Sequence, residues 1–249
     1  MSEVLLSAKS LVKRFGGLAA VNDVSVDLAR NRIHAVIGPN GAGKSTLTNL
    51  LSGDLPATSG TVALAGKEVS GATPEKISRL GLGRSYQKTN IFLPFTVWDN
   101  VRLAAQSRTP HPARWLRDAK KFGDVNTRAE KALELAGLKD RRSALAGATS
   151  HGEQRQLEIA MALATEPQVL LLDEPLAGMG VAEAERMVAL LLRIKPDHAM
   201  MLVEHDMDAV FALADELTVM VNGQVIASGA PAAVRADANV QAAYLGEEH

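Results

Sequence analysis

The chain has 249 residues, with 27 Lys and Arg against 28 Asp and Glu, a formal net charge of -1 and no cysteine. This charge balance excludes a general attraction to nucleic acid or anionic lipid, so any polyanion must be bound at a local site. Without cysteine there is no disulfide, thiolate nucleophile or zinc-cysteine site, and no two of the six histidines have the i, i+4 spacing of a helical metal site. We therefore expect one large domain or two small ones, with no structural metal.

Short apolar segments separated by turn residues predict strands in the first third of the chain. The segment 33–37 predicts a buried strand, followed by a helix over 44–52 that ends where Gly53 stands. The other strands expected in this part are 4–7, 24–28 and 61–64.

The middle of the chain changes to a helical period. Apolar residues recur at helical spacing over 96–163, which predicts a helical insert. The apolar runs 169–172 and 200–203 then indicate buried parallel strands, separated by a helix over 182–194. We expect strands from both sides of the insert to share one sheet. Near the end, Asn222-Gly223 between two apolar stretches predicts a hairpin turn.

No apolar run approaches the roughly 20 residues that cross a bilayer. Lys9, Lys13 and Arg14 interrupt the apolar N-terminal stretch, which offers no cleavage site for export. We therefore expect a cytoplasmic protein. The segment 108–128 carries six Lys and Arg, which indicates either a solvated helix face or a segment close to lipid headgroups.

A phosphate-binding loop is the strongest motif of the chain. The segment GPNGAGKST, residues 38–46, fits G-x-x-x-x-G-K-[ST] and lies between the predicted strand and helix. Its backbone N-H groups, the helix N-terminus and Lys44 would hold phosphate, while the Ser45 hydroxyl would reach Mg²⁺. A glycine-rich turn that binds nothing does not account for this context. The candidate ATP-binding residues here are Gly38, Pro39, Asn40, Gly41, Ala42, Gly43, Lys44, Ser45 and Thr46.

Two carboxylates follow a buried strand in VLLLDEP. Asp173 is the candidate ligand of Mg²⁺ and Glu174 the group that polarises the attacking water, because α/β sheets place their chemistry at strand ends. Taken alone, the pair could be a polar exit to the surface. His205 follows another buried strand, where a lone histidine is more often structural, and Gln87 alone is only an amide in a loop.

Together these motifs resemble the ATP-binding cassette (ABC) ATPases along essentially the whole chain. GPNGAGKST resembles their Walker A loop, VLLLDEP their Walker B strand with its catalytic glutamate, and TSHGEQRQLEIAMAL their signature helix. The resemblance makes Gln87 the Q-loop glutamine, His205 the switch histidine and Phe15 the aromatic that stacks on adenine, although Phe15 alone indicates a core side chain. It implies ATP and Mg²⁺ as cofactors. The implied catalytic residues are Glu174 and His205, and the implied metal ligands are Ser45, Gln87 and Asp173.

The resemblance also implies the fold. We expect a single ABC ATPase domain over 1–249, in the α/β class, with a P-loop NTPase (RecA-like) core, an antiparallel β subdomain and a helical insert. The core with its β subdomain would comprise 1–88 and 166–230. The helical subdomain would comprise 89–165, and 231–249 would form a C-terminal helical tail.

In this family two cassettes, identical or related, pack head to tail and share ATP. By resemblance, Ser150, His151, Gly152 and Glu153 of one chain would contact ATP held by the other. Ser150 and the N-H of Gly152 would begin a helix aimed at an anion, and Ser150 alone indicates a cap of its own helix, which is compatible with that contact. The chain departs from the common LSGGQ signature in this segment, and Gly180 stands where many members carry a carboxylate.

Within the superfamily, the phrases FGGLAAV, VEHDMDAV and AAYLGE are similar to ATPases of branched-chain or hydrophobic amino acid importers. SHGEQ and LAGM also resemble urea and short-amide importers. Either likeness implies a peripheral subunit on the inner face of the membrane, bound to permease subunits and not to nucleic acid. The alternatives are a soluble ABC ATPase acting on DNA or ribosomes, or a small GTPase or kinase. A docking surface for the membrane subunit is expected at Ile91, Phe92, Leu93, Phe95 and Trp98.

Overall fold

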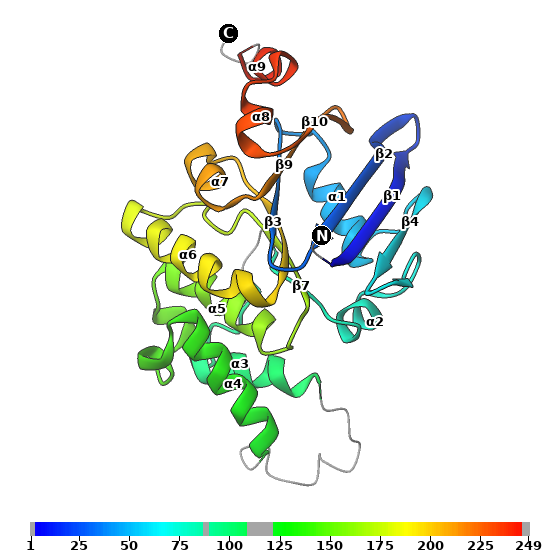
Figure 1. The fold of residues 1–249 in the computed structure, drawn as a ribbon. Helices are drawn as coiled ribbons and strands as arrows, with labels where there is room; N and C mark the ends of the chain where they lie inside the picture. The colour runs from blue at the N-terminus through cyan, green and yellow to red at the C-terminus, as the bar shows by residue number, and fades with distance from the viewer. Residues whose placement is uncertain (1–2, 87–89, 109–121, 246–249) are drawn as a thin grey trace. The chain divides into compact units, whose positions relative to one another are not determined.

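The computed structural model describes residues 3–86, 90–108 and 122–245 (Figure 1). The chain forms two compact units. The first comprises Met1–Leu82, Gln168–Glu174 and Lys195–His249, and the second comprises Gly83–Pro167 and Pro175–Ile194.

A six-stranded sheet organises the first unit, in the order β10-β9-β3-β8-β7-β6. Strand β3 pairs in parallel with β8 and β9, and β7 pairs in parallel with β8, so strands from both sides of the helical insert share one sheet, as predicted. Every residue of β3, β7 and β8 is buried, as in a parallel sheet with both faces covered. The strands are β3 (Ile33–Ile37), β6 (Leu82–Arg84), β7 (Val169–Asp173), β8 (Ala199–Val203), β9 (Glu216–Val221) and β10 (Gln224–Gly229).

The two faces of this sheet bury different side chains. Val36 packs with α1 (Lys44–Ser52) and with a second sheet, whereas Ala35 and Ile37 pack with α7 (Met207–Leu213) and α8 (Pro231–Arg235). This alternation follows from the period of two along a strand. The remaining helices of the first unit are α2 (Pro74–Arg79) and α9 (Ala238–Leu245).

The second sheet is antiparallel, in the order β2-β1-β4-β5. Its long strands extend beyond the predicted segments 4–7 and 24–28. Register shifts break the pairing of β1 with β2, and Ser10 and Asp23 adopt positive φ of 46° and 56° near them. Such bulges interrupt the alternation of apolar residues, so the sequence predicts only part of each strand. The strands are β1 (Val4–Phe15), β2 (Leu18–Ala29), β4 (Ser59–Leu64) and β5 (Lys67–Glu68).

The second unit is helical, as the apolar period of 96–163 predicted. Helices α3, α4 and α5 pack on one another, and α6 packs on α4 and α5 (Figure 1). The unit therefore includes Pro175–Ile194, which the predicted boundary had placed in the core. No helix in the described part of the chain is long and apolar enough to cross a membrane. The helices are α3 (Val97–Gln106), α4 (Gly123–Ala136), α5 (His151–Leu163) and α6 (Val181–Ile194).

Candidate functional site

The loop between β3 and α1 requires glycine at two positions. Gly38 and Gly43 have φ of 150° and 99°. A Cβ atom would lie 2.0 Å from the carbonyl oxygen of Met220 at Gly38, and 2.2 Å from that of Ala20 at Gly43. No side chain fits there, so the sequence folds this segment into a tight backbone cradle.

The N-terminus of α1 carries no side-chain cap. Its N-cap is Gly43, and its first turn holds no acidic residue. By contrast, Thr96, Ser150 and Asp206 cap α3, α5 and α7 with side-chain oxygens. The first N-H groups of α1 and its positive dipole end therefore face the loop without a capping anion, which makes this end suited to phosphate.

Lys44 lies inside the cradle. Its side chain is buried, and its Nζ donates to the carbonyl oxygens of Gly38 at 2.5 Å and Pro39 at 2.9 Å. The ammonium is thus held against the loop, where a phosphate oxygen could form a charge-assisted hydrogen bond with it. Ser45 is exposed and Thr46 is half-buried in the first turn of α1.

The hairpin turn between β9 and β10 supports this loop. Asn222 and Gly223 have φ of 49° and 79°, as predicted for the turn. The N-H of Gly223 donates to the carbonyl oxygen of Ala42 at 3.0 Å, and its carbonyl accepts from the N-H of Asn22 at 2.8 Å. Sequence reasoning identified the turn but not this role, because the contact joins segments about 180 positions apart in the chain.

Two carboxylates stand at the end of β7. Asp173 is the last residue of the strand and is only 2 % exposed. Glu174 follows with a φ of 49°, and its N-H donates to the carbonyl oxygen of Val203 at 2.9 Å. A left-handed backbone at a residue other than glycine costs about 1–3 kcal/mol and is concentrated at functional positions.

His205 lies just beyond the end of β8, the strand between β3 and β7. Because these strands are parallel, the loop after β3, the carboxylates after β7 and His205 lie at one edge of the sheet. The backbone N-H of His205 donates to Oε2 of Glu204 at 3.2 Å, and that carboxylate is buried. The sequence did not identify Glu204 as a candidate, because its position there indicates only the end of a strand.

The ring of Phe15 is 50 % exposed at the end of β1. The Nζ of Lys13 lies 5.2 Å from its centroid. The core interpretation of Phe15 is therefore wrong, and the ring is accessible for stacking on a planar ligand.

Gln87 lies outside the described residues, but helix α5 contacts the residues on either side of it. Arg155 donates to the carbonyl oxygen of Tyr86 at 2.8 Å, and Glu158 accepts from the N-H of Asn90 at 2.7 Å. Arg155 and Glu158 also form a buried ion pair at 3.0 Å. Burial raises the pKa of the Glu158 carboxyl, and the Asn90 N-H and the guanidinium oppose that rise. The pair therefore holds Tyr86 and Asn90 to α5.

Ser150 caps α5 in the second unit. Its Oγ accepts from the N-H of Glu153 at 3.2 Å, and the Glu153 carboxylate accepts from the N-H of Ser150 at 3.0 Å. This is a capping box, so the interpretation of Ser150 as the cap of its own helix is confirmed. Gly152 is buried in the same first turn, and His151 is exposed.

The apolar segment before α3 is largely exposed. Phe92, Leu93 and Phe95 are about half exposed, and the rings of Phe92 and Phe95 stack with centroids 5.3 Å apart. Leu145 is also exposed. It lies close to them in the fold, since its backbone pairs with that of Thr96. We call Phe92, Leu93, Phe95 and Leu145 the apolar patch.

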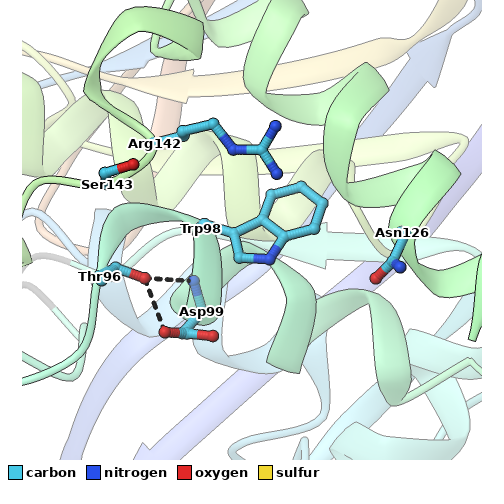
Figure 2. Close-up of a pocket in the computed structure, with 6 residues that line it drawn as sticks. All are labelled: Thr96, Trp98, Asp99, Asn126, Arg142 and Ser143. Carbon is cyan, nitrogen blue, oxygen red and sulfur yellow. Dashed lines mark hydrogen bonds between the residues drawn. The ribbon is translucent and has the colours of Figure 1, made fainter. Parts of the chain in front are cut away.

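Trp98 does not belong to the apolar patch. The guanidinium of Arg142 lies over its indole, 4.3 Å from the centroid, and the ring lines a pocket beside Asn126 (Figure 2). In the same pocket, Oγ1 of Thr96 donates to Oδ2 of Asp99 and accepts from its N-H (Figure 2). The pocket has a volume of about 450 Å³ and is lined by Thr96, Trp98, Asp99, Asn126, Arg142 and Ser143.

A family model described as "ABC transporter" matches residues 21–177, and one described as "Branched-chain amino acid ATP-binding cassette transporter" matches residues 224–249. The high-affinity branched-chain amino acid transport ATP-binding protein LivG of Escherichia coli is 36% identical, over 99% of this chain and 100% of its own. BraF of Pseudomonas aeruginosa, also a high-affinity branched-chain amino acid transport ATP-binding protein, is likewise 36% identical over 99% of this chain and 100% of its own.

Solved structures give the same fold. An ADP-bound cassette of an ABC transporter, MJ1267, is 31% identical, covers 99% of this chain and 100% of its own, and has a TM-score of 0.87. A bacterial ABC transporter cassette described as dimeric, MJ0796, is 22% identical over 91% of this chain and 99% of its own, with a TM-score of 0.77. The predicted fold class is confirmed.

Proposed function

Because the chain belongs to the ABC transporter family of ATP-binding cassettes, we propose that it is the ATP-hydrolysing subunit of a membrane importer for branched-chain amino acids. The observation that carries this proposal is the likeness to LivG and BraF over essentially the full length of both chains. The match of residues 224–249 to a branched-chain amino acid transporter model favours this solute over urea or short amides. Neither a DNA or ribosome function nor a GTPase or kinase has comparable support.

ATP binds in the first unit, with its phosphates in the loop 38–46. Lys44 and the uncapped N-terminus of α1 neutralise their charge. Ser45 and Asp173 would hold Mg²⁺, with Gln87 as a further ligand by resemblance, because hydroxyl, carboxylate and amide oxygens are the ligands it prefers; when bound it would neutralise charge on the phosphates. The exposed face of Phe15 stacks on the adenine.

Glu174 acts as the general base in hydrolysis. Its carboxylate orients and polarises the water that attacks the terminal phosphate, and its left-handed backbone fixes the side chain at the sheet edge. His205 donates to the same phosphate as negative charge develops, since its exposed ring lies at the end of the neighbouring strand.

A second cassette, identical or related, completes the site. Its bound ATP meets Ser150, His151, Gly152 and Glu153 at the start of α5, where the helix dipole favours an anion. The dimeric MJ0796 cassette supports such pairing for the fold.

The membrane subunits bind the apolar patch, which places the protein on the inner face of the membrane. The patch exposes two stacked rings and two leucines in a chain that is only 4% aromatic. A groove beside it, with a volume of about 220 Å³, is lined by Phe95, Asp99, Arg102, Leu103 and Gln106, and so continues the patch along α3. A short amphipathic helix of the membrane subunit would fit there.

Co-expression with permease subunits tests the proposal. The chain should co-purify with them from detergent extracts, and the reconstituted complex should take up labelled leucine in an ATP-dependent manner. Phe92→Ser with Phe95→Ser should abolish uptake and leave ATP hydrolysis by the isolated chain unchanged. Uptake of urea without leucine would replace the proposed solute, and failure to co-purify would contradict the importer assignment.

A further inference from the structure

A carboxylate from α6 already occupies the start of α5. Oγ of Ser150 donates to Oε1 of Glu183 at 2.8 Å. A Cβ atom built on Gly152 would lie 2.7 Å from Cδ and 2.8 Å from Oε1 of Glu183, so the carboxylate rests directly on the backbone of Gly152. Ser150, Gly152 and Glu183 all belong to the second unit.

This carboxylate is held as an anion. The Ser150 hydroxyl lowers the pKa of Glu183 most, burial opposes it, and hydrogen bonds from the backbone N-H groups of Gly180 and Gly152 lower it further. These donors, together with the positive end of α5, are the groups that would bind a phosphate at this position.

We propose that Glu183 is a built-in competitor of the nucleotide: its carboxylate fills the phosphate position at Ser150 and Gly152 until ATP on the partner cassette displaces it. The inference rests on the proposed pairing of two cassettes. A carboxylate and a phosphate are both acceptor-only anions, so they compete for the same donors. Glu183 is half-buried, so its side chain can turn into water when displaced.

The start of α6 directs Glu183 toward this position. The carbonyl of Gly180 accepts from the N-H groups of Glu183 and Ala184 at 3.0 and 2.9 Å, which places Glu183 in the first turn of α6. Glu185, two positions further along, is exposed. It carries the same charge on the same helix, so it is a matched control.

The test measures ATP-driven association in the Glu174→Gln background, which should hold ATP without hydrolysing it. Removing the competitor with Glu183→Gln or Glu183→Ala should lower the ATP concentration for half-maximal association about two- to five-fold, the effect of one carboxylate at a helix N-terminus. Glu185→Gln should leave that concentration unchanged. Light scattering against ATP concentration provides the measurement, with circular dichroism melts to show that each variant is folded.

The direction of the effect separates competition from a structural role. If Glu183 only braced α5, its removal would loosen the site and weaken association. The inference would be overturned if Glu174→Gln associates with ATP and both Glu183 variants need the same or a higher ATP concentration for half-maximal association. Absence of ATP-driven association in every variant would instead contradict the pairing itself, and the competitor with it.

Discussion

Gly223 supports the loop 38–46 from a distant part of the chain. Its N-H supports Ala42 in the phosphate loop, and its φ of 79° suits glycine. A Cβ atom there would lie 2.9 Å from the carbonyl oxygens of Ala19 and Ala20, which are backbone atoms that cannot move aside easily. The hairpin turn therefore supports the loop that we propose binds the phosphates of ATP.

Gly223→Ala should weaken ATP binding. Backbone strain of about 1–3 kcal/mol and displacement of Ala42 would distort the loop, so we expect a loss of roughly tenfold in affinity. Gly66→Ala is the matched control, because Gly66 has a φ of 74° but nothing within 4 Å of its Cβ position. Calorimetric titration with ATP measures both. Equal affinity in the two variants would show that the turn does not position the loop.

Among elements, those with a local signal were predicted most closely. The bounds of β3 and α1 agree with the predicted 33–37 and 44–52, because a buried strand, a glycine loop and a glycine cap are all encoded in adjacent residues. The full lengths of β1 and β2 were not predictable, since bulges at Ser10 and Asp23 break their alternation.

Contacts between segments far apart in the chain could not be predicted from the sequence. The phosphate loop was recognisable from its motif between a strand and a helix, and the acidic pair from its strand taken together with that loop. The support from Gly223, the buried Glu204 and the contact of Glu183 with Ser150 were not, because each depends on packing between elements far apart in the chain. The position of α6 in the second unit was missed for the same reason.

The ion pair within α5 allows a prediction about that helix. Arg155 and Glu158 are both about 95 % buried, so Glu158→Gln would remove the negative charge of this buried pair. Loss of one partner of a buried pair costs about 3–5 kcal/mol of unfolding free energy. The exposed pair of Arg30 with Glu3 is the control, and Glu3→Gln should change stability by less than about 1 kcal/mol. Urea unfolding compares them, and similar small effects would show that the pair contributes little.

For the whole molecule, His34 should set the response of stability to acid. It is buried in β3, with Nε2 2.7 Å from Oγ1 of Thr218. Burial lowers its pKa below 6.5, although Glu216 and Asp27 act in the opposite direction. The unfolded chain therefore binds the proton more tightly than the folded one. The contribution of neutral His34 to the free energy of unfolding is therefore fully present above about pH 6.5. Below that pH the free energy of unfolding should fall, by up to about 1.4 kcal/mol per pH unit.

The measurement is the unfolding free energy between pH 5 and 7.5. His34→Gln can still bond to Thr218 and has no titrating ring, so it should reduce the slope below about pH 6.5. A slope equal to that of the parent would assign the acid sensitivity to other groups.

The central claim is that Glu174, at the edge of the six-stranded sheet, hydrolyses ATP held by the loop 38–46. The most direct test is phosphate release by Glu174→Gln, which keeps the shape of the side chain but loses its charge and basicity. We predict hydrolysis at least about 100-fold slower than in the parent, unchanged ATP affinity, and accumulation of the ATP-bound pair of cassettes. Glu185→Gln should hydrolyse ATP at the parental rate. Parental turnover by Glu174→Gln would contradict the account and leave His205 as the candidate for the catalytic group.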